Sequence, residues 1–199
     1  MKKFTKYILF ISLGLLCSCS DYLDIVPDNV TTLDIVFNNK NTAQRYLANC
    51  YHFVPDHGSV KRIPGMGAGH ECWFYTDKDS YFDNEVSFYI ARGLQNTNAP
   101  YANYWDGEGG SKLPMFRAIR ECNIFLSYVR DQHKVNDLTD SERKRWIAEV
   151  NVLKAYYHFF LFEHYGPIPI VDEALPVSTS SEGVKVTRMP VDQVVDFMV

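Results

Sequence analysis

The sequence lacks several features that would point to a particular class of function. Its 20 Lys and Arg residues are outnumbered by 24 Asp and Glu, and no basic stripe remains for nucleic acid once the first residues are set aside. It has no long hydrophobic run, because the apolar stretch from Tyr7 to Leu16 is too short for a permanent transmembrane helix. No recognised metal-ligand spacing, catalytic carboxylate motif or fixed-period repeat is visible. These absences argue against a nucleic-acid-binding protein and a metalloenzyme.

Cysteine is also scarce, with five residues in the chain. Two of them, Cys17 and Cys19, lie in an N-terminal leader, which leaves Cys50, Cys72 and Cys122. An odd number of cysteines argues against a disulfide framework. Because Cys50 and Cys122 fall on apolar helix faces, we expect both to be small core residues. Whether any disulfide forms among the three is left open.

The first twenty residues, Met1 to Ser20, read as a secretory leader: three lysines, an apolar run, and small residues around cysteine. A buried N-terminal helix is the alternative. Leu16 stands three residues before Cys19 and Ser18 immediately before it, which resembles a bacterial lipobox. We therefore predict a signal peptide over residues 1–18, a lipid on Cys19, and an anchor and tether over residues 19–40. The mature protein would sit on a membrane, outside the cytoplasm.

The strongest structural signal is a helix predicted from Thr139 to Tyr165. Thr139 and Glu142 form a capping box, in which two side chains satisfy backbone N–H groups of the first turn. Gly166, followed by two prolines, ends the helix. The apolar stripe broadens after Ala155, as in a helix packed between neighbours. The predicted buried face holds Trp146, Val150, Leu153, Tyr157 and Phe160 or Leu161, and the charged residues Glu142, Arg143, Lys144 and Lys154 are expected largely on the other side.

Three further helices are predicted. Asn41-Thr42 caps one that ends before Pro55, Pro114 opens a second, and Pro190 precedes the start of a third. The helix after Pro114 and the helix after Thr139 are joined by a short connection, so they should form an antiparallel hairpin.

Between residues 56 and 112 the pattern changes to loops rich in glycine, Asp, Asn and aromatic residues. Gly65, Gly67 and Gly69 do not form a nucleotide-binding motif, because no apolar strand precedes them. Aromatic rings stack on sugar faces while Asn and Asp bind hydroxyl groups. The alternative is that these rings fix the loops to the helical core. The candidate ligand-binding residues are Trp73, Tyr75, Tyr81, Asp83, Asn84 and Tyr101.

Three segments resemble one protein family. AEVNVLKAYYHFFLFEHYGPIPI, from Ala148 to Ile170, resembles the helix of SusD/RagB-type outer-membrane nutrient-binding lipoproteins. SDYLD after Cys19 resembles the opening of these proteins, and IRECNIFL, from Ile119 to Leu126, resembles their I-R-x-C-N-x-F-L segment. Lys154 stands where the family more often has Arg, and Lys cannot form the same bidentate pair with a carboxylate. An ion pair at this position therefore cannot be assumed from the resemblance.

The resemblance implies an all-α fold of antiparallel hairpins, like those of tetratricopeptide repeats, with long irregular aromatic-rich loops. Residues 41–199 would be the N-terminal helical domain of such a protein, incomplete at its C-terminal end. Trp105 would pack before the second helix. The implied function is a Bacteroidetes surface lipoprotein of the outer membrane that binds oligosaccharides and delivers them to a SusC-like TonB-dependent transporter.

Two other functions remain as alternatives. The chain could be a structural helical adaptor that holds the transporter without binding a ligand. A surface glycoside hydrolase is the other, although no carboxylate pair has a recognised catalytic context. We expect no enzymatic activity, no cofactor and no metal, and the identity of the glycan or peptide and any use of calcium are left open.

Overall fold

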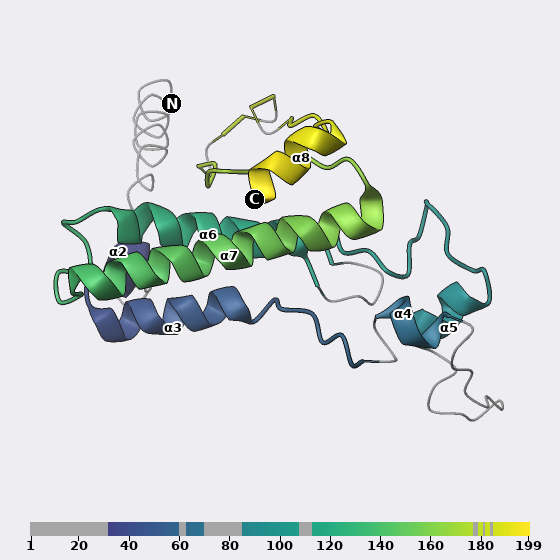
Figure 1. The fold of residues 1–199 in the computed structure, drawn as a ribbon, viewed down its shortest axis with the longest axis horizontal. Coiled ribbons are helices and arrows are strands. Elements are labelled where there is room, and N and C mark those ends of the chain that lie inside the picture. Colours follow the sequence, from purple (N-terminus) through teal and green to yellow (C-terminus); the bar gives the residue numbers. More distant parts are fainter. Residues whose placement is uncertain are drawn as a thin grey trace, which may run out of the picture. The chain divides into compact units, whose positions relative to one another are not determined.

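The computed structural model describes residues 32–59, 63–69, 85–107, 113–176, 179–180, 182–183 and 185–199. Every regular element within these ranges is a helix, which confirms the all-α prediction. The chain divides into two compact units, Met1–Ile35 and Val36–Val199, and the following description concerns the second. The described residues form α2 (Leu33–Val36), most of which belongs to the first unit. The helices of the second unit are α3 (Lys40–Tyr51), α4 (Pro64–Gly67), α5 (Val86–Ala91), α6 (Met115–Arg130), α7 (Asp140–Tyr165) and α8 (Val191–Met198) (Figure 1).

Both ends of α7 form as the sequence predicts. The Glu142 N–H lies 3.3 Å from Thr139 Oγ1, and the Thr139 N–H lies 3.1 Å from Glu142 Oε2, which completes the capping box. Gly166 ends the helix with a φ of 68°, a conformation that favours glycine, and its N–H donates to the Phe162 carbonyl at 2.8 Å. The longest helix of the described chain is therefore fixed at each end by local chemistry.

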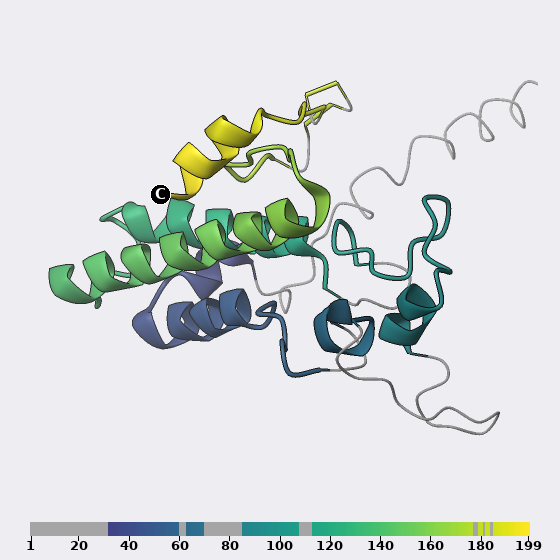
Figure 2. The ribbon, with the colours of Figure 1, turned by 45° about the vertical axis from the view of Figure 1, so that its right-hand side comes forward.

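Helix α7 packs against three other helices of this unit. It packs along α6 as an antiparallel hairpin, which confirms the prediction, and it also contacts α3 and α8. Helices α3 and α8 lie on opposite sides of the α6/α7 pair (Figures 1 and 2). These neighbours account for apolar residues on several sides of the second half of α7, although Val152 and Phe159 remain 69% and 48% exposed. The predicted buried face is confirmed, with Trp146, Val150, Leu153, Tyr157, Phe160 and Leu161 all at most 7% exposed.

Two charged residues of α7 do not lie on its solvent side as predicted. Arg143 and Lys154 are 8% and 5% exposed. The Arg143 guanidinium donates to the carbonyls of Val129 at 2.6 Å and Val135 at 3.1 Å, next to the last turn of α6. The last carbonyls of a helix have no partner within the helix, and a cation is favourable there. The spacing of apolar residues along α7 could not indicate this contact, because the contact depends on how the connection between α6 and α7 folds.

The start of α3 also differs from the prediction. Its N-cap is Asn39, whose Oδ1 accepts the Thr42 N–H at 3.1 Å, rather than Asn41-Thr42. The Asp137 carboxylate accepts the Lys40 N–H at 2.8 and 3.0 Å, which satisfies another donor of the first turn. Helix α6 begins at Met115, one residue after the predicted Pro114. The predicted loop region contains two short helices, α4 and α5, whose few residues carry no sustained periodicity.

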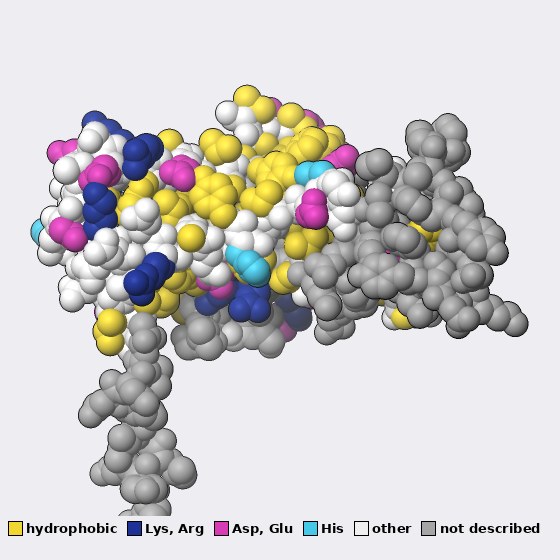
Figure 3. All heavy atoms as spheres, turned by 90° about the horizontal axis from the view of Figure 1, so that it is seen from below, with side chains coloured by type: hydrophobic (Ala, Val, Ile, Leu, Met, Phe, Trp, Pro, Cys, Tyr) yellow, Lys and Arg dark blue, Asp and Glu magenta, His cyan; other side chains and the backbone are white. Residues whose placement is uncertain are grey.

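Cys50 and Cys122 are fully buried free thiols, as predicted for core residues. A hydrogen bond between the two thiols, together with burial, raises the pKa of Cys50. Cys72 lies outside the described residues. The apolar surface is not confined to the core, however. Hydrophobic side chains also reach the solvent in a band across the described part of the face drawn in Figure 3.

The contact between α3 and α7 should make stability depend on pH. The Lys40 ammonium, assisted by the Thr139 hydroxyl, lowers the pKa of Glu142 from 4.5 to about 2. Because the folded-state pKa is the lower one, this contribution is present above about pH 4.5 and is lost as the pH falls towards 2. We expect Glu142→Gln to flatten the dependence of the melting temperature on pH between 2 and 5. Lys40→Met should do the same, and an unchanged slope in both variants would contradict the assignment.

Candidate functional site

Tyr101 is the one candidate ligand-binding residue that lies within the described residues. Its ring stacks on that of Tyr89 from α5, with centroids 4.3 Å apart and planes 19° from parallel. The loop between Tyr89 and Tyr101 is held by hydrogen bonds to its own side-chain amides. Gln95 Oε1 accepts the Tyr101 N–H at 2.7 Å, and Asn96 Oδ1 accepts the Ala99 N–H at 2.7 Å. Side chains of the loop thus position the aromatic pair.

The segment after Tyr101 is fixed to the end of α7. Tyr104 is fully buried, and its ring lies 4.9 Å from that of Phe160 and 4.7 Å from that of His164. The Tyr165 hydroxyl accepts the Tyr104 N–H at 2.8 Å and donates to the Ala102 carbonyl at 3.3 Å. Loops that carry recognition residues are usually held in this way by a rigid scaffold.

Trp105 packs into the helical core, as predicted. Its ring makes edge contacts with Phe116 at 4.6 Å and Tyr165 at 5.5 Å, and the Arg188 guanidinium lies 5.3 Å from its centroid. With these contacts around the ring, Trp105 fixes the loop to the helical core.

Tyr89 covers one face of the Tyr101 ring. The predicted set did not include Tyr89. Tyr89 could have been chosen on the same grounds as the other candidates, because its segment is as rich in aromatic residues as theirs.

The other predicted site residues cannot be placed. Cys19 and the candidates Trp73, Tyr75, Tyr81, Asp83 and Asn84 lie outside the described residues. Their roles remain predictions. Within the described chain there is no group of three or more His, Cys, Asp or Glu side chains that could hold a metal ion.

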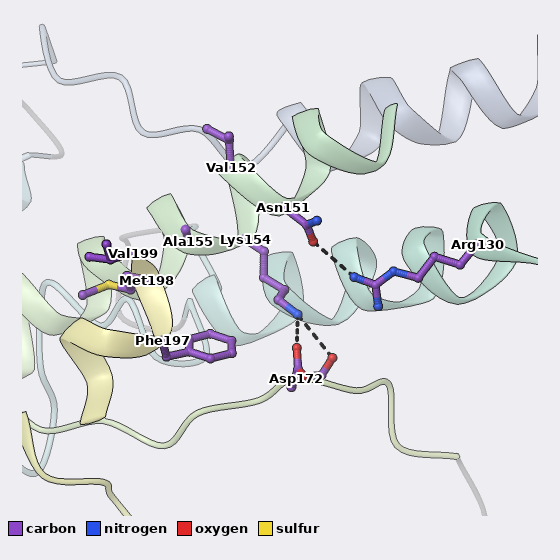
Figure 4. Close-up of a pocket in the computed structure, with 9 residues that line it drawn as sticks. All are labelled: Arg130, Asn151, Val152, Lys154, Ala155, Asp172, Phe197, Met198 and Val199. Carbon is purple, nitrogen blue, oxygen red and sulfur yellow. Dashed lines mark hydrogen bonds and ion pairs between the residues drawn. The ribbon is translucent and has the colours of Figure 1, made fainter. Parts of the chain in front are cut away.

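A second site is a polar hollow of about 310 Å³ between α6, α7, α8 and Asp172 (Figure 4). The Lys154 ammonium forms an ion pair with the Asp172 carboxylate. It also donates to Asn123 Oδ1 at 3.1 Å and to the Asp172 carbonyl at 3.2 Å. An ammonium has three N–H donors, so each has an acceptor. Lys154 therefore forms an ion pair, which could not be assumed from the sequence.

Two further residues, Asn123 and His158, lie around Lys154. Asn123 donates its amide to the Val171 carbonyl at 3.0 Å, as expected for a polar residue inside a helix. His158 is fully buried, with Nδ1 2.8 Å from the Lys154 carbonyl and Nε2 accepting the Val171 N–H at 3.4 Å. This arrangement requires the neutral ring with its proton on Nδ1, and burial lowers the pKa of His158 accordingly.

The rim of the hollow carries a second cation. Arg130 lies 3.4 Å from Asn151 Oδ1, and the Phe197 ring lies 5.5 Å from the Lys154 ammonium. The Lys154 hydrogen bond lowers the pKa of Asp172, which is thus ionised and paired. In this hollow the lysine is thus paired and the buried histidine is neutral. We interpret this network as structural, linking α6, α7 and the segment after Ile170.

A family model matches most of the chain. The model is that of a SusD-like family described as starch-binding and associating with the outer membrane, and it matches residues 21–198. The chain belongs to this SusD-like family. The helical hairpin thus belongs to a known type of fold.

Solved SusD-like structures share this fold. A laminarin-binding SusD-like protein is 18% identical with a TM-score of 0.59, and the match covers 81% of this chain and 32% of that one. For a SusD-like carbohydrate-binding protein of Bacteroides fragilis the values are 21%, 0.54, 82% and 30%. Another SusD-like protein of Bacteroides fragilis gives 17%, 0.53, 83% and 28%. No curated protein matches the chain.

The chain thus spans about a third or less of the length of these structures. Among the described helices, none has both the length and the apolar character needed to cross a membrane.

Proposed function

We propose that this SusD-like protein is a lipid-anchored cell-surface protein that binds oligosaccharides and passes them to a SusC-like TonB-dependent transporter in the outer membrane. The observation that carries the proposal is the family match over residues 21–198, with its description as starch-binding and associating with the outer membrane. Two of the similar structures are described as binding laminarin or carbohydrate. The chain would act by binding and not by catalysis.

The Tyr89–Tyr101 pair supplies a physical basis for glycan binding. A stacked aromatic pair on a loop that is fixed to α7 offers a rigid apolar plane to the face of a sugar ring. Rigidity matters because a preorganised contact loses little conformational entropy on binding. Trp73, Tyr75, Tyr81, Asp83 and Asn84 are proposed to extend this surface.

The anchor is proposed to be a lipid on Cys19. Several acyl chains on one residue give stable attachment, because each buried methylene adds about 0.8 kcal/mol. Labelled palmitate should enter the wild-type protein but not a Cys19→Ala variant. If the variant remained attached to the membrane, the proposed anchor would be wrong.

Glycan binding can be tested by calorimetric titration of the chain with purified starch and laminarin oligosaccharides. We expect Tyr101→Ala to weaken binding about tenfold, which corresponds to about 1.4 kcal/mol for a contributing aromatic contact. Tyr101→Phe is the matched control, since it keeps the ring and should bind as the wild type does. Each variant should first show an unchanged melting temperature.

The possible outcomes separate the functions. Binding that does not change in Tyr101→Ala would exclude this loop as the ligand surface. No binding to any glycan, with a stable complex with the transporter, would favour the structural adaptor. Release of reducing sugar during the titration would revive the hydrolase.

A further inference from the structure

Cys50 and Cys122 meet where α3 packs against α6. Cys50 lies in the last turn of α3, and Cys122 lies in the middle of α6. Both residues are fully buried, and their thiols are hydrogen-bonded to each other. The two sulfur atoms are therefore in contact, although the residues lie far apart in the sequence.

The surroundings of the two thiols favour a neutral species. The Cys122 thiol and burial raise the pKa of Cys50, and the nearby Glu121 carboxylate adds to this effect. A thiolate, which is the form that attacks a substrate or binds a metal, is thus disfavoured in the folded protein. A disulfide carries no charge and has no strong hydrogen-bond donor, so it suits this apolar site.

The two cysteines also flank the aromatic-rich loop segment of residues 56–112. Helix α3 ends one residue after Cys50, and the chain returns beside Cys50 in α6. A bond between Cys50 and Cys122 would close a covalent ring that contains Tyr89 and Tyr101. Both ends of the loop segment would then be tied to the same point of the helical core. A bond that closes a long loop is expected to restrict the unfolded chain strongly.

We propose that Cys50 and Cys122 form a disulfide as the chain folds, with an external disulfide as the oxidant. One protein thiolate attacks the external disulfide, forms a mixed disulfide and releases one thiol. The other protein thiolate then attacks the protein sulfur of the mixed disulfide, closes the Cys50–Cys122 bond and releases a second thiol. Two protein thiols thus lose two electrons and two protons, and the external disulfide gains them. The reaction precedes burial, because solvent-exposed thiols ionise more readily.

Refolding of the full chain in oxidised glutathione, with reduced glutathione as the reference, tests the proposal. After alkylation of the remaining thiols and digestion without reductant, mass spectrometry should find Cys50 linked to Cys122 and Cys72 alkylated. The folded, reduced chain should acquire the bond at least about tenfold more slowly, because its thiols are buried. Absence of the linked peptide, a bond from Cys72 to either residue, or equal rates would overturn the proposal.

The melting temperature gives a second measurement. The chain refolded in oxidised glutathione should melt about 10 °C above the reduced chain. Cys50→Ala and Cys122→Ala should each abolish this difference, whereas Cys72→Ala, the matched control, should keep it. Each variant is compared with itself in the two conditions, so a loss of core packing does not affect the comparison. A difference that persists in Cys50→Ala would show that another bond causes it and would overturn the proposal.

Limited proteolysis tests the ring itself. After a single cut within residues 56–112, the two fragments of the oxidised chain should migrate together on a denaturing gel without reductant and separately with it. Fragments that separate without reductant would contradict a bond across the loop segment. This result also decides the question where a core variant does not fold, because it uses the wild-type chain. None of these measurements involves a glycan, so they are independent of the proposed function.

Discussion

Replacing Asp172 with alanine is expected to lower the free energy of unfolding by about 2 kcal/mol. The change leaves the Lys154 ammonium, which is 5% exposed, without its counterion. A buried charge that has lost its partner typically costs about 3–5 kcal/mol. The Asp172 side chain is itself 66% exposed, and the Asn123 oxygen remains as an acceptor at 3.1 Å. Water therefore screens part of the ion pair, and the expected value lies below that range. Urea denaturation at pH 7 measures the effect.

A second change should restore stability. In Asp172→Ala combined with Lys154→Met, no buried charge remains, and an apolar replacement of a buried ion pair is often neutral. The double variant should therefore be more stable than Asp172→Ala alone. Glu173→Ala, a change at the exposed neighbouring position, is the control and should have little effect. A double variant less stable than Asp172→Ala would contradict the assignment.

Gly107→Ala is also expected to have a large effect and to lower the free energy of unfolding by about 3 kcal/mol. Gly107 has a φ of 85°, and an added Cβ would lie 2.8 Å from Pro114 Cδ and 2.9 Å from Pro114 N. The variant thus combines strain at positive φ with a clash against backbone. Thermal unfolding followed by circular dichroism measures the loss. Because Gly107 joins the loop after Tyr101 to α6, the same change should weaken glycan binding.

Gly93→Ala separates the two causes. Gly93 has a φ of 72°, but no heavy atom lies within 4 Å of the position that an added Cβ would take. Gly93→Ala should therefore lower the free energy of unfolding only by the strain contribution, about 1 kcal/mol. Equal losses of stability in Gly93→Ala and Gly107→Ala would show that the contact with Pro114 contributes little to the effect.

Much of the helical framework could be predicted because it is encoded locally. Thr139 and Glu142 form their capping box within four consecutive residues, and Gly166 ends α7 through its own backbone. The buried face of α7 followed from periodicity, because its apolar residues need only a neighbour and not a particular one. These features depend on short stretches of sequence that carry their own structural information.

Long-range polar contacts could not be predicted in this way. Arg143 and Lys154 were assigned to the solvent side because charged residues usually are, yet both are buried among acceptors from other elements. Asn39 replaces Asn41 as the cap, and the Lys40 N–H is satisfied by Asp137, 97 residues away. Such partners become visible only when the hairpin and α3 are placed together.

The site was predicted only in part. The aromatic composition indicated a recognition loop and included Tyr101, while Trp105 was correctly assigned to packing. Composition does not say which ring stacks on which, so Tyr89 was missed. The roles of the remaining candidates, from Trp73 to Asn84, stay predictions.

The contact of Arg143 with the α6–α7 connection has a consequence for engineering the protein. An exposed connection between two helices is ordinarily a good place to insert a tag or a foreign domain. Here the guanidinium binds the Asp131 and Lys134 carbonyls within that connection at 3.1 and 3.0 Å, in addition to the last turn of α6. A cargo spliced between these two positions would separate acceptors that one side chain holds together, so this connection is a poor choice of fusion site.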